Sequence, residues 1–296
     1  MSLSQTDPNL HMHRSRMADF RRFLREFTDG PVEKIALAIL VLALLISIFA
    51  PIIIQNYSEI SPLDRMKAPS AQHLFGTDHL GRDVFARSMV GTRNSLIIGF
   101  SVAFLTTVIG CTLGLVAGFI KVGDRVIMRL MDGFMAIPNV LLAIALVALM
   151  GSSLTTIIVA ITVPEIPRMA RIVRSVVVSL KEMPFIDAAV TMGTPSWKIL
   201  LRHLLPNTVG ALSVQATATC ASAIMTEAIL SFLGAGTPPD IPSWGGIIAE
   251  SRVFFQIAPW AIGFPGLMLS LLVLSVNILG DRLREVLDPR VARRRA

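Results

Sequence analysis

Residues 94–120, NSLIIGFSVAFLTTVIGCTLGLVAGFI, contain no Asp, Glu, Lys or Arg. A helix of about 20 apolar residues is long enough to cross the hydrocarbon core of a bilayer. A helix also satisfies its backbone hydrogen bonds within one segment, which a lipid environment requires. This stretch therefore predicts a membrane-spanning helix and an all-α integral membrane protein.

Uncharged runs of similar or greater length occur on both sides of this stretch, at residues 35–58, 133–164, 203–226 and 253–280. The run 133–164 is too long for one crossing, and Gly151, Ser152 and Ser153 interrupt it. We therefore expect two helices there, at about 129–150 and 154–174, and six transmembrane helices in all. Only residues 154–164 of the fourth helix are strictly apolar, so a five-span chain with a re-entrant segment stays open.

Composition excludes an ordinary soluble protein. Hydrophobic residues make up 53% of the 296 residues and charged residues only 16%, against about 25% charged in a typical soluble domain. The mean hydropathy is +0.66. The net charge of +7 could suggest a nucleic-acid partner, but with six spans 21 of the 27 basic residues fall on one side of the membrane. That bias marks the cytoplasmic side, so we expect no nucleic-acid partner.

The charge distribution also sets the expected organisation of the chain. Residues 1–34 form a cytoplasmic N-terminal segment, 35–56 the first transmembrane helix and 57–93 an extracytoplasmic loop. Residues 94–281 form a core with five transmembrane helices and a cytoplasmic loop at 164–206, followed by a basic cytoplasmic tail at 282–296. Both termini are therefore predicted to be cytoplasmic, with anionic membrane lipid next to the basic ends.

The loop at 164–206 has an unusual pattern for a connection. Arg168, Arg171 and Arg174 are three positions apart, so they fall near one face of a helix. Further along, Pro184 can begin a short helix, Asp187 suits its first turn and Gly193 can end it. The small residues of this helix would let another protein approach its backbone closely.

The same residues carry a family resemblance. This part of the chain resembles the loop that carries the Glu-Ala-Ala motif in permeases of bacterial ATP-binding-cassette (ABC) importers. The residues that carry the resemblance are Asp187, Ala188, Ala189, Gly193, His203, Leu205 and Pro206. The spacing is kept throughout. Asp187 replaces Glu, which keeps the charge but shortens its reach, and His203 replaces Ile, as in the permeases of peptide and nickel importers.

The resemblance extends over nearly all of the chain after about residue 30. Residues 74–84, LFGTDHLGRDV, resemble the segment that follows the first helix in the C-type subunit of dipeptide, oligopeptide and nickel importers. Residues 242–245, 258–260, 277–281 and 287–290 match the same subunit. The resemblance implies the transmembrane domain of a type I ABC importer in the bacterial inner membrane.

Partners and energy source follow from that resemblance. It implies a homologous permease subunit as a heterodimer partner, two ABC ATPase subunits and an extracytoplasmic substrate-binding protein. The chain contains no G-x-x-x-x-G-K-[ST] loop, so we expect it to bind no cofactor and no ATP and to be no enzyme by itself. ATP and Mg would sit on the partner ATPases. Asp187, Ala188, Ala189, Gly193, His203, Leu205 and Pro206 are the expected ATPase-docking residues.

Several other residues invite a functional interpretation. Glu227 is the one acid in an otherwise apolar stretch, so it could line the pathway or lie at the membrane interface, as could Arg168 and Arg171. His73, Asp78 and His79 are a weak metal pattern, and we expect a structured outer loop and no metal site. Trp244 and Trp260 are predicted to anchor at the interface. Gly110, Gly114 and Gly118 predict close helix packing.

Two other classes of membrane protein have sequence features that this chain can be compared with. An ion-coupled secondary transporter should have buried ionisable pairs and inverted repeats, and an intramembrane enzyme needs a catalytic pair within its spans. The sequence offers neither, so we expect no catalytic residue. The expected substrate is a di- or oligopeptide delivered by the binding protein, with nickel complexes, opines and glutathione-like solutes as alternatives.

Overall fold

The computed structural model describes residue 27 and residues 30–287 of the chain. This described part contains helices and one isolated bridge, between Thr77 and Asp83, but no strand. The α-helices are α2 (Pro31–Ile53), α3 (Val84–Phe119), α4 (Lys121–Met135), α5 (Asn139–Met150), α6 (Leu154–Lys181), α7 (Pro184–Thr191), α8 (Ser196–Ile199), α9 (Leu205–Phe232), α10 (Trp244–Ser251) and α11 (Trp260–Leu287). Short turns of 3-10 helix lie at Pro62–Asp64 and Arg252–Phe254, and a π-helical segment at Leu200–Leu204.

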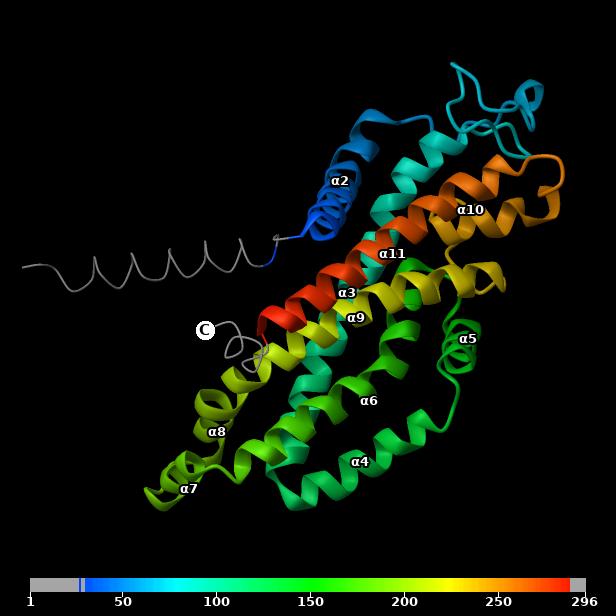
Figure 1. Ribbon diagram of the computed structural model, residues 1–296. Coiled ribbons are helices and arrows are strands. Elements are labelled where there is room, and N and C mark those ends of the chain that lie inside the picture. The colour runs from blue at the N-terminus through cyan, green and yellow to red at the C-terminus, as the bar shows by residue number, and fades with distance from the viewer. Residues whose placement is uncertain (1–26, 28–29, 288–296) are drawn as a thin grey trace, which may run out of the picture.

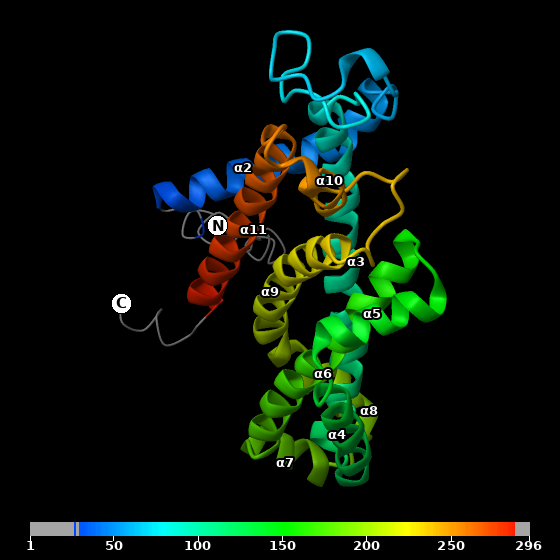
Figure 2. The ribbon, with the colours of Figure 1, turned by 90° about the vertical axis from the view of Figure 1, so that its right-hand side faces the viewer.

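The helices form an elongated bundle around α3, which runs from one end of the molecule to the other (Figures 1 and 2). Residues 54–83 and the start of α3 lie at one end, which we call the loop end. Helices α7 and α8 and the first residues of α4 lie at the other, the α7–α8 end. Much of the predicted basic tail and most of the predicted N-terminal segment lie outside the described residues.

Close packing of α3 against α6 depends on glycine, as the sequence predicts. A Cβ atom on Gly110 would lie 2.6 Å from Met169 Cβ, one on Gly114 would lie 2.6 Å from the carbonyl oxygen of Ala170, and one on Gly118 would lie 2.6 Å from Val177 Cβ. The two backbones can therefore approach more closely than any larger residue would allow. This confirms the structural interpretation of the three glycines.

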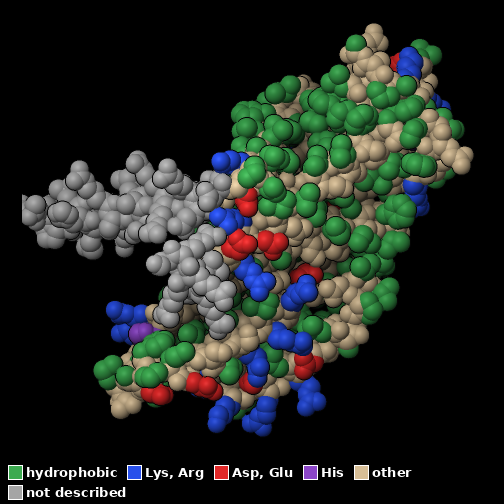
Figure 3. Space-filling model, viewed as in Figure 1, with side chains coloured by type: hydrophobic (Ala, Val, Ile, Leu, Met, Phe, Trp, Pro, Cys, Tyr) green, Lys and Arg blue, Asp and Glu red, His purple; other side chains and the backbone are tan. Residues whose placement is uncertain are grey.

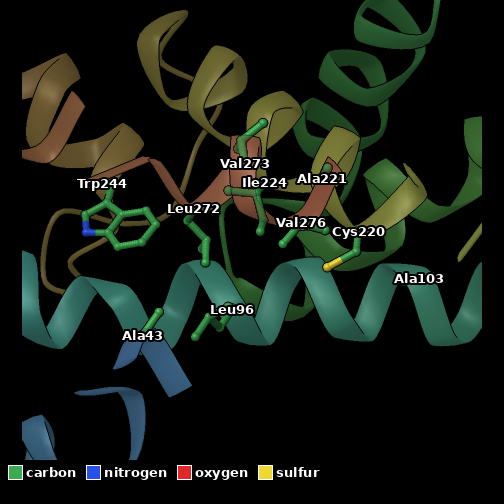
Figure 4. Close-up of a cluster of buried hydrophobic side chains, with 10 residues drawn as sticks. All are labelled: Ala43, Leu96, Ala103, Cys220, Ala221, Ile224, Trp244, Leu272, Val273 and Val276. Atoms are coloured by element: carbon green, nitrogen blue, oxygen red, sulfur yellow. The ribbon is translucent and has the colours of Figure 1, made fainter. Parts of the chain in front are cut away.

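A second core region joins α2, α3, α9 and α11 near the loop end (Figure 4). Ala36, Ala43 and Ala50 are the buried residues of α2, one every seven positions, so a stripe of small side chains faces the bundle. Trp244 is buried in this core and its Nε1 donates to the carbonyl oxygen of Ser88 at 3.1 Å. The predicted interfacial position of Trp244 is therefore wrong, because the indole N–H has a partner inside the fold.

Four described helical segments are long and apolar enough to cross a membrane: α2, α3, Ser196–Phe232 and α11. Helices α4 and α5 would make a fifth if they are counted as one broken span, since an 89° bend separates them. The expected single helix at 129–150 is therefore wrong. Pro138 stands at the bend, and a proline lacks the N–H that a continuous helix needs and disfavours helical backbone in the residue before it.

Helix α6 is longer than expected. It runs through Pro164 and Pro167 to Lys181, so the first part of the predicted loop at 164–206 is a continuation of this helix. Its 28 residues are long enough to cross a bilayer, but its charged residues set it apart from the four apolar segments. The chain leaves α6 only at Glu182, directly before the short helix α7.

Candidate functional site

Helix α7 forms as the sequence predicts, and both of its ends have a local cause. Pro184 occupies the first turn, where its missing N–H costs nothing. At the other end, Gly193 adopts φ +74°, its N–H donates to the carbonyl oxygen of Val190 at 2.9 Å, and Thr194 N–H donates to that of Ala189 at 3.0 Å. This pair of bonds is a Schellman motif, which requires a left-handed residue where Gly193 stands.

The two faces of α7 have different roles. Ile186 and Ala189 are buried against a core that includes Met169 and Val173 of α6. Asp187 and Ala188 are exposed on the other face. Ala189 therefore holds the helix in place, whereas Asp187 and Ala188 are available to a partner.

Large apolar side chains surround this exposed face. The side chain of Trp197 is 64% exposed and that of Met192 is 78% exposed. The sequence motif did not indicate these two residues, because they lie between its positions. We call the exposed group the α7–α8 patch; it consists of Met183, Phe185, Val190, Met192, Trp197 and Leu201.

His203, Leu205 and Pro206 lie where α8 joins α9. Pro206 has no N–H to donate to the preceding turn, and the chain passes through the π-helical segment Leu200–Leu204 just before it. Asn207 Nδ2 donates to the carbonyl oxygen of His203 at 2.6 Å, so a side chain satisfies a group in this irregular turn. The His203 ring lies near that of Phe185, with 6.3 Å between centroids. Leu205 and Pro206 therefore shape a helix junction.

The three arginines of α6 differ in their surroundings. Arg171 Nη2 donates to Asp132 at 2.8 Å, and Arg174 forms two hydrogen bonds with Asp124, one of them at 2.8 Å. Both aspartates belong to α4, so these pairs join α4 to α6. Arg168 is exposed. Asp124 and Asp132 lie about two turns apart on α4, so both side chains can reach α6.

Glu227 is fully buried in α9. Its Oε1 accepts hydrogen bonds from Ser231 at 2.8 Å and from Ser243 at 2.7 Å. Ser243 also accepts from Gly246 N–H and so caps α10. A buried carboxyl group needs such donors, and the hydrogen bond from Ser243 holds the start of α10 against α9.

Charged residues at the loop end form a second built structure, which we call the four-charge cluster: Asp78, Arg82, Arg87 and Glu250. Arg82 Nε donates to Asp78 at 2.7 Å, and Arg87 Nη1 donates to Asp78 at 3.0 Å and to Glu250 at 2.8 Å. Burial works to raise the pKa of Glu250, but the hydrogen bond and charge of Arg87 and the charge of Arg82 hold that pKa below its ordinary value. Buried charges are thus paired, as they must be.

The remainder of the 74–84 motif builds a folded loop, as expected. His73 Nδ1 lies 2.9 Å from Asp83, which caps α3 by accepting from Ala86 N–H. Gly76 adopts φ +71° beneath Trp260, whose Nε1 donates to the carbonyl oxygen of Thr77 at 3.2 Å. Among the described residues no group of three or more His, Cys, Asp or Glu side chains could hold a metal ion.

Comparisons with known proteins agree with this architecture. The family described as "Binding-protein-dependent transport system inner membrane component" matches residues 110–293. The "Probable peptide ABC transporter permease protein y4tQ" of Sinorhizobium fredii is 49% identical over 251 residues, which cover 85% of this chain and 86% of that protein. The "Dipeptide transport system permease protein DppC" of Alkalihalophilus pseudofirmus is 40% identical over 93% of this chain and 91% of its own.

Two further matches widen the comparison. The "Glutathione transport system permease protein GsiD" of Pectobacterium atrosepticum is 40% identical over 92% of this chain and 90% of its own. Among solved structures, an inward-facing MetNI methionine ABC transporter matches with a TM-score of 0.56 and 24% identity, covering 69% of this chain and 96% of that chain. At this identity the structural match shows a shared fold.

Proposed function

Because the chain belongs to the family of binding-protein-dependent transport system inner membrane components, we propose that it forms, with a homologous permease subunit, the membrane pathway of an ATP-driven importer. The single observation that carries the mechanism is the α7–α8 patch. It places large exposed apolar side chains on and around the short helix α7, which is anchored to α6 by Ile186 and Ala189.

In the proposed topology the α7–α8 end faces the cytoplasm and both termini lie on that side of the inner membrane. Figure 3 supports this arrangement, since Lys and Arg side chains gather over the end formed by α4, α6 and α7, whereas apolar side chains cover much of the opposite half. The chain has six spans if α4 and α5 together form one broken span and if α6 also crosses the membrane, with its charged side chains packed against α4. The extracytoplasmic binding protein would then approach the loop end.

The α7–α8 patch would dock into a cleft on an ATPase subunit. Apolar groups at the centre of an interface, with polar groups such as Asp187 around them, are the usual composition of a protein contact. Movement of the ATPase would reach α6 directly, since Ile186 and Ala189 share a core with Met169, Val173 and Val177. ATP and Mg would be held by the ATPase subunits, and this chain would hydrolyse nothing itself.

A peptide is the proposed cargo, delivered by the binding protein. Two of the relatives quoted above carry "peptide" or "dipeptide" in their names, and one carries "glutathione", which is itself a tripeptide. Nickel complexes and opines are the remaining alternatives, and ligand binding by the cognate binding protein would separate them.

Substitution of one exposed residue tests the docking proposal. Ala188→Arg adds a large charged side chain to the exposed face of α7 without touching the buried face. We expect this variant to insert into the membrane normally but to lose co-purification with the ATPase subunits and to lose transport. Ser179→Arg, at an exposed position of α6 close to α7, is the matched control and should keep both. Normal assembly and transport by Ala188→Arg would contradict the proposal.

A further inference from the structure

Helix α4 presents two different side-chain rows on its exposed face. One row is basic, with Lys121, Arg125 and Arg129 each four positions from the next, and all three are exposed. A neighbouring row is apolar and includes Val126 and Leu130, which are 66% and 59% exposed. Residues four positions apart lie on one side of a helix, so the two rows run side by side along α4.

The acidic residues of α4 do not neutralise the basic row. Asp124 and Asp132 pair with Arg174 and Arg171 of α6. Within the described part of the chain, no ion pair is formed by Arg125 or Arg129. The exposed face of α4 is therefore cationic as well as apolar.

The polarity of this face also changes along the helix. Lys121 lies at the α7–α8 end, where it lines the same hollow as Asp187. A shallow groove begins between Arg125 and Arg129 and continues toward the far end of α4, where its lining is apolar. The groove is lined by Arg125, Val126, Arg129, Leu130, Phe134 and Ile137. Gly133 adds no side chain to it, and a Cβ there would meet nothing within 4 Å. At 1.5 Å per residue, the step from Arg125 to Phe134 spans about 14 Å.

We propose that this groove binds an anionic phospholipid of the cytoplasmic leaflet. The phosphate and its negative headgroup would lie between Arg125 and Arg129, and an acyl chain would run along Leu130 and Phe134 toward Ile137. The basic row ends at Arg129, whereas the apolar lining of the groove continues to Ile137. The charges therefore lie at one end of the groove, as the headgroup lies at the surface of a lipid leaflet. The inference rests on the cytoplasmic placement of the α7–α8 end in the proposed function.

Charge complementarity favours this occupant over the second permease subunit. Exposed cations that lie beside apolar side chains match the negative surface of the cytoplasmic leaflet, where each Lys or Arg adds to the attraction. The guanidinium groups also suit phosphate, since they offer donors in a planar fork. Contact between α4 and the partner permease is the alternative that the experiment below must distinguish.

The test uses the assembled transporter purified in nanodiscs of an equimolar mixture of phosphatidylglycerol and phosphatidylcholine. Retained lipid is identified by native mass spectrometry after detergent release. We expect the double variant Arg125→Gln/Arg129→Gln to retain about tenfold less phosphatidylglycerol than the parent. The variant Arg125→Lys/Arg129→Lys should recover part of it, since charge is kept and the planar fork is lost.

A matched control has the same change of charge at the loop end. Arg65 and Arg93 are also exposed, so Arg65→Gln/Arg93→Gln should retain phosphatidylglycerol like the parent. A photoreactive residue placed at Val126 should form adducts with phosphatidylglycerol. Equal lipid retention by the Arg125/Arg129 variant and the parent, or adducts of residue 126 with the partner permease in place of lipid, would overturn the proposal. Neither readout requires transport, so failure of the docking proposal would not affect them.

Discussion

Arg87 and Glu250 are 163 positions apart in the sequence, yet the guanidinium of Arg87 donates to both carboxylate oxygens of Glu250, at 2.8 and 3.2 Å. Arg87 stands in the first turns of α3 and Glu250 near the end of α10. Asp78 accepts from the same guanidinium, at 3.0 Å. The four-charge cluster therefore fastens the folded loop, α3 and α10 together at one point.

Removal of the Glu250 side chain should strongly destabilise the fold at the four-charge cluster. In Glu250→Ala, the buried Arg87 keeps Asp78 but loses two hydrogen bonds, and breaking a buried pair costs about 3–5 kcal/mol. Thermal unfolding of the purified transporter should show a clear drop in midpoint. Glu285→Ala, which removes the exposed partner of Arg282, is the control and should cost less than about 1 kcal/mol. Similar midpoints for the two variants would contradict the expected role of the cluster.

The same cluster predicts sensitivity to acid. The pKa of Glu250 in the folded protein lies below its ordinary value of 4.5, so its ionised form stabilises the fold. That stabilisation is complete above the ordinary pKa and is lost as the pH falls through the lowered value. Unfolding midpoints measured on either side of pH 4.5 should therefore fall more steeply in the parent than in Glu250→Ala. Parallel pH curves would show that another group is responsible.

Gly193 should resist substitution for a backbone reason. Its φ of +74° ends α7, and an alanine in a left-handed conformation costs about 1–2 kcal/mol. Nothing lies within 4 Å of the position that a Cβ would take, so crowding makes no contribution. Gly193→Ala should fray α7 and weaken ATPase co-purification several-fold.

Gly210 offers the control for that measurement. It also has nothing within 4 Å of its Cβ position, but it lies inside α9 without a positive φ. Gly210→Ala should therefore leave co-purification unchanged and slightly favour the helix. Equal behaviour of the two variants would mean that the conformation of residue 193 is unimportant for docking.

Close contact between α3 and α6 predicts a different glycine effect. A Cβ on Gly114 would lie 2.6 Å from the carbonyl oxygen of Ala170, so the two helices must separate to admit it. Gly114→Ala should lower the unfolding midpoint, with a cost of about 1–3 kcal/mol. Gly263→Ala, where the added atom meets nothing within 4 Å, should not lower it. A stable Gly114→Ala variant would place the helices farther apart than described.

Cysteine labelling checks the proposed sidedness. Leu63 at the loop end is 91% exposed and Met192 in the α7–α8 patch is 78% exposed, whereas the native Cys111 and Cys220 are buried and should react slowly. A membrane-impermeant maleimide added to intact cells, after removal of any outer membrane barrier, should label Leu63→Cys and not Met192→Cys. In inverted vesicles from cells that lack the ATPase subunits, where the α7–α8 patch is uncovered, the result should reverse. The opposite pattern would overturn the topology.

Long uncharged runs predicted most of the fold, because a bilayer leaves few alternatives for twenty apolar residues. The run at 203–226 lies within helical segments, the run at 94–120 lies in α3 except for its last residue, and most of the run at 253–280 lies in α11. The short helix α7 could also be predicted, since Pro184 and Gly193 each have one strong local preference. The bend before α5 was missed because the run at 133–164 hid Pro138 among apolar neighbours.

Tertiary contacts determine which side chains are buried and which are paired, and these features could not be predicted from the sequence. Ala188 and Ala189 are identical residues, and only the packing of α7 on α6 decides that the second is buried. The partner of Arg87 could not be deduced, because Glu250 is distant in the chain and no local spacing joins them. Exposure of Met192 and Trp197 likewise depends on where α7 and α8 leave the bundle.

The π-helical segment before Pro206 makes Ser196–Phe232 a single 37-residue helix, about 55 Å long at 1.5 Å per residue. Trp197 lies near one end and Glu227 near the other. Between them, Thr217 touches α11 where Gly280 leaves no room for a side chain, since a Cβ there would lie 2.6 Å from Thr217 Oγ1. Along the helix this contact lies about 30 Å from Trp197 and about 15 Å from Glu227. A displacement that starts at the α7–α8 end would therefore reach the contact with α11 before it reached the buried carboxyl group of Glu227.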